Sequence, residues 1–218
     1  MAKGQLMRTE TTLSYDVDTQ RDFMLPNGAL YVPGAERIAP TLGALTRLAR
    51  EKNIRLVASV DCHLPGDEEL KRNGGPYPDH CMDGTPGQRK IDETMPADPS
   101  VVPSREISRT ELDAALAGKR ELVVEKRHVD VFVGNRNANA LFERLLAHYS
   151  DIVIYGVCTD ICVDYVVRAL IRFGPKLHVV TDAVAALDSQ RAAEVQRDWQ
   201  KAGVELLTFA ELRARLSS

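Results

Sequence analysis

The sequence has no long apolar run and no strong excess of charge of either sign. Its 218 residues are 44% hydrophobic and 27% charged, and the formal net charge is −3. No segment reaches the roughly 20 apolar residues of a membrane-spanning helix, and the balanced charge offers no basic surface to nucleic acid. We therefore expect a globular protein without membrane or nucleic-acid partners, which binds a small molecule and associates with copies of itself as a homo-oligomer.

Cysteine is scarce, and its distribution does not indicate a disulfide framework. Residues 1–10 are polar and lack the apolar core of a secretory signal, which favours a cytoplasmic location. In that reducing compartment, cysteines are expected to be free thiols or metal ligands. The four cysteines are Cys62, Cys81, Cys158 and Cys162.

Short apolar runs rich in β-branched residues alternate with runs of helical periodicity. The expected strands are residues 12–17, 54–60, 122–125, 152–156, 177–181 and 204–209. The expected helices are residues 39–52, 138–148, 162–173 and 190–202. This alternation predicts an α/β domain of three layers, in which helices cover both faces of a parallel sheet. The carboxyl ends of all strands then share one edge of the sheet, where ligands bind and where we expect the chemistry.

One connection, between residue 61 and about residue 119, is much longer than the others. It has few apolar runs and holds seven of the eleven prolines. Connections of this length are usually functional. A helix over residues 109–117, with Ser108 as its N-cap, is expected inside it. Because the chain has no repeats and no large shift in composition, residues 1–218 are expected to form a single domain with a loop-rich insertion at about 61–119.

The segment V-C-T-D-I-C-V, residues 157–163, joins an expected strand to an expected helix. Cys162 stands where this helix begins, so unpaired backbone N–H groups and the positive end of the helix dipole favour its thiolate form. We interpret Cys162 as a candidate nucleophile. The alternative is a buried structural cysteine.

Two charged residues are expected at the same edge of the sheet as Cys162. The first strand ends in D-V-D-T-Q-R-D-F, which contains Asp18, and the third ends in V-V-E-K-R-H, which contains Lys126. The three side chains suit nucleophilic catalysis, in which Asp18 takes the thiol proton and passes it to the leaving group while Lys126 stabilises the thiolate. Taken singly, Asp18 could cap a turn and Lys126 could be a solvated strand end.

A second polar cluster follows the second strand, in V-D-C-H-L-P-G-D-E-E-L and in the later Y-P-D-H-C. Asp61 and His63 are two residues apart, so in an extended chain both side chains point the same way and Cys62 points to the other face. His80 and an acid from residues 67–69 could complete a metal site. Carboxylate and imidazole ligands favour zinc, manganese or iron. The alternatives are a zinc site that uses the two adjacent cysteines, or histidines bonded to the loop backbone.

The motifs D-T-Q-R-D-F, V-E-K and G-V-C-T-D-I-C-V occur in this order with long separations. Together they resemble the isochorismatase-like cysteine hydrolases, and D-C-H with P-D-H-C resembles the nicotinamidase (pyrazinamidase) branch of that family. The resemblance covers about residues 13–209. It implies a six-stranded parallel sheet with strand order 3-2-1-4-5-6 and a catalytic triad of Asp18, Lys126 and Cys162.

The resemblance also implies further site residues. The backbone N–H groups of Cys158 and Cys162 would form an oxyanion hole, shaped by a cis peptide bond between Val157 and Cys158. Aromatic walls of the pocket would fall on Phe23 and Tyr77. The implied metal ligands are Asp61, His63, Glu68 and His80, where Glu69 or Asp67 could replace Glu68.

Several residues depart from the family pattern. Tyr77 stands where many nicotinamidases have Trp, and Ile161 stands where a His often precedes the nucleophile. Asp130 and Val133 replace residues that are often small or aromatic. These departures bear on the substrate that the pocket accepts rather than on the hydrolytic residues.

The resemblance implies a metal-assisted cysteine amidohydrolase that converts nicotinamide to nicotinate and ammonia through a thioester with Cys162. Zinc is the first choice of metal, with manganese and iron as alternatives. A rival within the family would act on a carbamoyl or aliphatic amide, or on isochorismate, although the intact metal ligands argue against isochorismate. A rival of another class is a catalytically silent metal-binding protein that keeps the fold.

Overall fold

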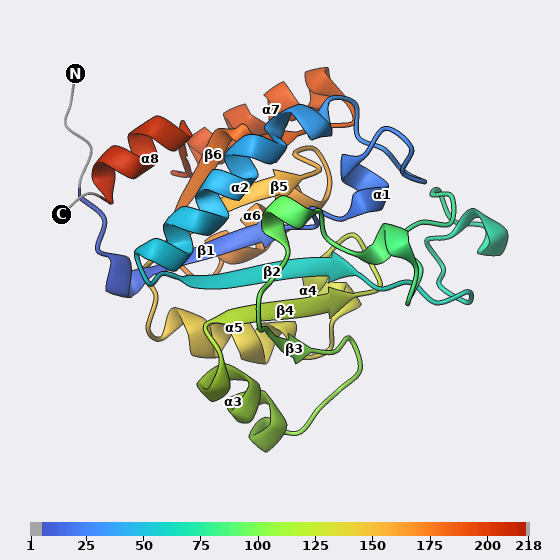
Figure 1. Ribbon diagram of the computed structural model, residues 1–218, viewed down its shortest axis with the longest axis horizontal. Helices are drawn as coiled ribbons and strands as arrows, with labels where there is room; N and C mark the ends of the chain where they lie inside the picture. The colour runs from blue at the N-terminus through green and yellow to red at the C-terminus, as the bar shows by residue number, and fades with distance from the viewer. Residues whose placement is uncertain (1–5, 217–218) are drawn as a thin grey trace.

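A parallel sheet of seven strands runs through the centre of the molecule (Figure 1). The structure is a computed structural model and describes residues 6–216. The strands are β1 (Thr12–Val17), β2 (Arg55–Asp61), β3 (Ser100–Val102), β4 (Glu121–Lys126), β5 (Asp151–Val157), β6 (Lys176–Ala185) and β7 (Glu205–Leu207). Their order is β3-β4-β2-β1-β5-β6-β7, and every neighbouring pair is parallel.

The sheet has one strand more than the six expected. The six expected strands correspond to β1, β2, β4, β5, β6 and β7, and their spatial order agrees with 3-2-1-4-5-6. The additional strand, β3, pairs with β4 at the edge of the sheet. With three residues inside a proline-rich connection, β3 is too short to show the alternation by which strands are identified in a sequence.

Within residues 6–216, eight α-helices connect or flank the strands. They are α1 (Arg21–Met24), α2 (Ala35–Glu51), α3 (Arg109–Gly118), α4 (Val131–Gly134), α5 (Ala138–Leu146), α6 (Cys162–Ile171), α7 (Ser189–Lys201) and α8 (Phe209–Arg215). Short 3-10 helices are η1 (Thr9–Thr11), η2 (Lys71–Asn73), η3 (Pro86–Gln88) and η4 (Asp92–Thr94). None of the helices within residues 6–216 has the length and apolar character needed to cross a membrane.

Helices cover both faces of the sheet, as the alternation of strands and helices predicts. Along β5, Ile152 and Ile154 face the core that α5, α6 and α7 complete, whereas Val153 and Tyr155 face the core that α2 and α8 complete. In Figure 1, α2 crosses the near face of the sheet. Because successive side chains of a strand point to opposite faces of the sheet, one apolar run contributes residues to both hydrophobic cores.

Capping residues decide where two of the helices begin. Ser108 caps α3, with both hydrogen bonds of a capping box to Glu111, so the helix expected inside the insertion is confirmed. Thr208 and Glu211 form a second capping box, which begins α8 at Phe209. The strand expected over residues 204–209 was therefore too long, because the chain turns into a helix after Leu207.

The long connection after β2 folds back over the carboxyl edge of the sheet. Isolated β-bridges join His63 to Met82 and Gln20 to Lys90. Lys90 is buried and forms an ion pair with Asp16 of β1, with 3.1 Å between Nζ and Oδ2. The connection thereby brings its own side chains to the ends of β1 and β2.

Candidate active site

The carboxyl ends of three neighbouring strands and the start of one helix meet at this edge. Asp61 ends β2, Lys126 ends β4, and Asp18 directly follows β1. Cys162 is the first residue of α6, which follows β5. Because β4, β2, β1 and β5 are consecutive in the sheet, four residues distant in sequence come together, and all four are buried.

The ammonium group of Lys126 lies at the centre of this group. Its Nζ atom lies 3.0 Å from Asp18 Oδ2 and 3.8 Å from Cys162 Sγ. It also donates hydrogen bonds to the Asp61 carboxylate and, at 3.2 Å, to the carbonyl oxygen of His128. The Lys126 side chain is 0% exposed, so it is not a solvated strand end.

The two carboxylate oxygens of Asp18 have different neighbours. The Ser59 hydroxyl donates a hydrogen bond of 2.7 Å to Asp18 Oδ1. Asp18 Oδ2 is buried, faces Lys126, and has no hydrogen bond of good geometry. Sequence reasoning did not identify Ser59, although a hydroxyl residue within the apolar run of β2 was a signal of a polar role.

The thiol of Cys162 is in an environment that favours its neutral form. Burial raises the pKa of Cys162 well above its usual value, Lys126 offsets this in part, and the carboxylates of Asp18 and Asp61 raise it further. Burial and the two carboxylates therefore act against the thiolate form that Lys126 favours. Ionisation of this thiol would be helped by a neighbouring base that accepts its proton.

The neighbouring charges stabilise one another. Burial lowers the pKa of Lys126, but the carboxylates of Asp18 and Asp61 outweigh it and hold that pKa well above its usual value. Burial raises the pKa of Asp61, but Lys126 and the two histidines beside it outweigh that effect and lower it. The site thus contains an ammonium ion against an ionised carboxylate.

The turn between β5 and α6 has the backbone form that the resemblance implied. The peptide bond between Val157 and Cys158 is cis. The N–H groups of Ile161 and Val163 both donate to the Cys158 carbonyl oxygen, at 3.1 and 3.0 Å. These bonds fix the turn on either side of Cys162.

Asp61, His63 and His80 form a cluster that could hold a metal ion. One ligand atom from each lies within 4.8 Å of the others. His63 Nδ1 is bonded to Asp67 Oδ2 at 2.9 Å, and His80 Nδ1 is bonded to the carbonyl oxygen of Pro78 at 2.7 Å. Each ring therefore directs Nε2 at the cluster, and Nε2 of His63 is buried without any hydrogen-bond partner.

The donor set fits a transition metal. Two imidazole nitrogens and a carboxylate oxygen are ligands that zinc, manganese and iron accept. The alternative site with cysteine ligands is not formed, because Cys62 Sγ is directed at Asp83 (3.6 Å) and Cys81 Sγ at the Gly87 carbonyl (3.9 Å).

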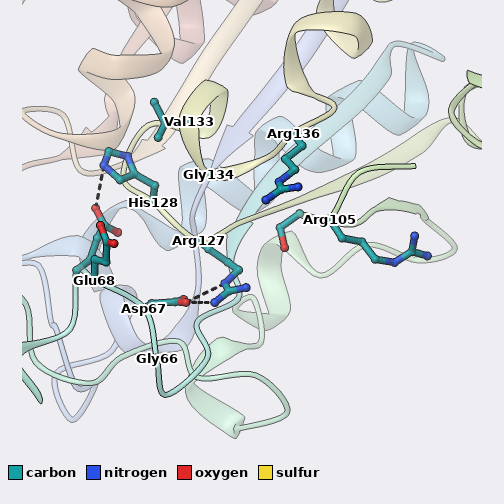
Figure 2. Close-up of a pocket in the computed structure, with 11 residues that line it drawn as sticks. Gly66, Asp67, Glu68, Arg105, Arg127, His128, Val133, Gly134 and Arg136 are labelled. Atoms are coloured by element: carbon teal, nitrogen blue, oxygen red, sulfur yellow. Dashed lines mark hydrogen bonds and ion pairs between the residues drawn. The ribbon is translucent and has the colours of Figure 1, made fainter. Parts of the chain in front are cut away.

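Glu68 does not join the cluster, which corrects its placement among the expected ligands. Its side chain is exposed and lines a cavity beside the cluster (Figure 2). The acids on either side of Glu68 face His63 instead. Asp67 binds Nδ1, and a Glu69 oxygen lies 3.9 Å from Nε2. The turn of the loop at this point directs Glu68 outward, a property that spacing along the chain does not show.

The two expected aromatic walls flank His80. The ring centroids of Phe23 and Tyr77 lie 5.4 and 5.9 Å from the centroid of the His80 ring. Burial raises the pKa of Tyr77 to about 12, so its hydroxyl is neutral at pH 7. Ile161, the N-cap of α6, is half-buried and packs against the cores on both faces of the sheet.

Gln20 also contributes to the site, although sequence reasoning did not identify it. Its side-chain oxygen accepts a 2.6 Å hydrogen bond from the Asp61 N–H, and its side-chain nitrogen donates to the Asp61 carbonyl at 2.8 Å. This pair of bonds fixes the backbone of Asp61 at the end of β2. The available signal was an amide side chain within the motif D-T-Q-R-D-F at the end of the first strand.

Comparison with known proteins shows the family of this chain and proteins that share its fold. Escherichia coli (strain K12) nicotinamidase is 24% identical over 200 residues, which are 89% of this chain and 93% of that protein. The structure of Pyrococcus horikoshii pyrazinamidase in complex with zinc is similar, with a TM-score of 0.71 and 23% identity over 91% of this chain and 99% of that one. N-carbamoylsarcosine amidase from Thermoplasma acidophilum gives a TM-score of 0.66 and 24% identity, over 91% and 96% of the two chains. Residues 17–211 match the model of the isochorismatase domain, and the chain is therefore a member of the isochorismatase family.

Proposed function

We propose that this isochorismatase-family hydrolase is a metal-assisted cysteine amidohydrolase that converts nicotinamide and water to nicotinate and ammonia. The contact of one buried ammonium group, that of Lys126, with Asp18, Cys162 and Asp61 carries the proposal. It joins an acid–lysine–thiol group to a metal-binding cluster in one site. The likeness to a nicotinamidase and to a zinc-containing pyrazinamidase supports the choice of substrate.

The first half of the reaction forms a thioester. The Cys162 thiol gives its proton to the Asp18 carboxylate, and the sulfur attacks the amide carbonyl carbon to form a C–S bond. Asp18 then returns the proton to the amide nitrogen, the C–N bond breaks, and ammonia leaves. Lys126 stays protonated and stabilises the thiolate as it forms, which the raised pKa of Cys162 makes necessary.

Charge on the carbonyl oxygen is stabilised by the backbone. We assign the N–H groups of Cys158 and Cys162 to this oxygen. The turn supports the assignment, because the N–H groups of Ile161 and Val163 are bonded to the Cys158 carbonyl and the Cys162 N–H between them has no such bond within residues 6–216. Aimed backbone donors of this kind lower a barrier by about 3 to 4 kcal/mol each.

The second half of the reaction releases the acid. Asp18 takes a proton from water, whose oxygen attacks the thioester carbon. The C–S bond breaks, and the sulfur regains its proton from Asp18. The product is nicotinic acid, which ionises to nicotinate as its proton passes to ammonia or solvent, and the protein returns to its starting state.

Asp61, His63 and His80 would hold the metal, and Glu69 is a better candidate than Glu68 for any further contact. A zinc, manganese or iron ion there would supply an electrophilic position for the pyridine nitrogen. Phe23 and Tyr77, whose rings both contact His80, would pack against the pyridine ring. These contacts would orient the amide toward Cys162.

An ammonia-release assay tests the proposal, with benzamide as the matched control for nicotinamide because it lacks only the ring nitrogen. We expect nicotinamide to be preferred, and we expect removal of metal with a chelator to raise KM for nicotinamide more than it lowers kcat. Equal rates on both amides, in protein that contains no metal, would overturn the nicotinamidase assignment. A faster reaction with a carbamoyl or aliphatic amide would assign the chain to another activity within the family. A cytoplasmic location, a homo-oligomeric state and a single domain stay predictions of the sequence.

A further inference from the structure

A cavity of about 720 Å³ lies beside the metal cluster. Asp67 and Glu69, which both approach His63, form part of its wall. Arg127 reaches across this cavity to Asp67, and Figure 2 shows its two contacts as dashed lines. The wall of the cavity is therefore joined by hydrogen bonds to the candidate metal ligand His63.

The carboxylate of Asp67 joins the two side chains. Its Oδ2 lies 2.9 Å from His63 Nδ1 and accepts a 3.0 Å hydrogen bond from the Leu64 N–H. Its Oδ1 accepts from two nitrogens of Arg127, of which Nε lies at 2.8 Å. The Asp67 side chain is 4% exposed, whereas that of Arg127 is 40% exposed.

These bonds determine which ring nitrogen of His63 carries the hydrogen. Arg127 and the Leu64 N–H can only donate, so Asp67 acts as an ionised acceptor toward them. His63 Nδ1 then donates the remaining bond to Asp67, and Nε2 keeps a free lone pair. That Nε2 atom is buried without a partner and lies 3.9 Å from Asp61 Oδ2, on the side where the cluster forms.

We infer that Asp67 and Arg127 are positioning residues that hold His63 in the orientation and tautomer required for metal binding. The inference rests on the metal site of the proposed function. Asp67 acts directly on the ring, and Arg127 acts through Asp67 by fixing and compensating its buried negative charge. Within residues 6–216, neither side chain forms a hydrogen bond or ion pair with Asp18, Lys126 or Cys162, so their effect is expected in metal affinity before it is expected in the chemical step.

Metal affinity can be measured without turnover. Protein stripped of metal is titrated with zinc in competition with a chromogenic chelator, for the wild type, Asp67→Ala, Asp67→Asn, Arg127→Met and Arg127→Lys. Loss of a partner that orients a ligating histidine lowers metal affinity by about 10- to 100-fold. We expect such a loss for Asp67→Ala and a smaller loss for Arg127→Met. Asp67→Asn and Arg127→Lys should lose less zinc affinity than Asp67→Ala and Arg127→Met. The asparagine can still accept a hydrogen bond from His63, and the lysine can still donate one to Asp67.

Arg136→Gln is the matched control. Arg136 lines the same cavity as Arg127 and is exposed, but it has no ion pair with Asp67. Its replacement removes the same charge from the cavity and should leave zinc affinity unchanged. Circular dichroism of each metal-free variant checks that the fold is kept, and Arg127→Met at a half-exposed position keeps the test informative if Asp67→Ala does not fold.

The double variant Asp67→Ala/Arg127→Met separates action through Asp67 from a general effect of charge. If Arg127 acts through Asp67, the double variant should bind zinc no more weakly than Asp67→Ala alone. Additive losses, or wild-type affinity in Asp67→Ala, would overturn the inference and leave the proposed function standing. A wild-type protein that binds no zinc, manganese or iron would overturn both the inference and the metal component of the proposed function.

Discussion

The ammonium group of Lys126 lies 3.0 Å from the carboxylate of Asp18, and both side chains are fully buried. An ion pair without water around it is costly to form, and removal of one partner leaves an uncompensated charge. In the proposed mechanism the contact of Lys126 with Cys162 gives this pair a chemical use, because the same cation lies beside the thiol that would lose a proton.

Asp18→Asn and Lys126→Met should each lower kcat by about 100-fold or more, with little change in KM, because one removes the base and the other the charge that favours thiolate. Lys126→Arg should also fail, since a planar guanidinium does not replace a compact ammonium. Steady-state ammonia release measures both constants. Lys90→Met is the matched control, because Lys90 forms a buried ion pair with Asp16 away from the thiol. It should lose stability while retaining most of kcat, and a fully active Lys126→Met protein would contradict the assigned role.

Cys162→Ala should abolish turnover, whereas Cys158→Ala should retain much of it. Both residues are 5% exposed, so the two substitutions act at equally buried cysteines. Only Cys162 is assigned a reacting sulfur, whereas Cys158 is assigned a backbone N–H that survives substitution. Ammonia release by each variant provides the measurement. Hydrolysis by the Cys162 variant near the wild-type rate would rule out the thioester.

Alkylation of Cys162 by iodoacetamide should accelerate from about pH 7 to about pH 9 without reaching a plateau, because thiolate forms only as pH approaches a raised pKa. Peptide mass spectrometry of metal-stripped protein, quenched at intervals, gives the rate at this residue. Asp18→Asn removes a negative charge that raises the pKa of Cys162. In this variant the alkylation rate should therefore begin to increase at a lower pH than in the wild type. A plateau already at neutral pH would indicate a preformed thiolate.

Gly156→Ala should destabilise the fold severely, by about 4 kcal/mol or more. Gly156 has a φ of 118°, and a Cβ atom there would lie 2.0 Å from the carbonyl oxygen of Val17, where β5 pairs with β1. Gly174→Ala is the control, since its φ is 81° but no atom lies within 4 Å of a Cβ. That variant should lose only about 1 kcal/mol. Urea denaturation compares the two, and equal losses would show that backbone conformation, not the Val17 contact, sets the cost.

The sequence by itself determined the order of the elements and much of the site. The alternation of strand-like apolar runs with helical runs predicted the parallel sheet, and Ser108 predicted the start of α3. Both signals lie in short segments of the sequence. The spacing of Asp61 and His63 placed both side chains on one side, since alternation along an extended chain depends on backbone geometry alone. The family resemblance supplied the strand order and the cis peptide bond before Cys158.

Only the tertiary structure decided which charges surround the Cys162 thiol and which carboxylates approach His63. The pKa of Cys162 depends on burial and on the charges of Lys126, Asp18 and Asp61, which other strands contribute. The family resemblance placed Glu68 among the ligands, whereas the folded loop turns Asp67 and Glu69 inward and holds Asp67 with an arginine 60 residues away. Such contacts exist only after the sheet has brought distant segments together, because burial and charge act through space rather than along the chain.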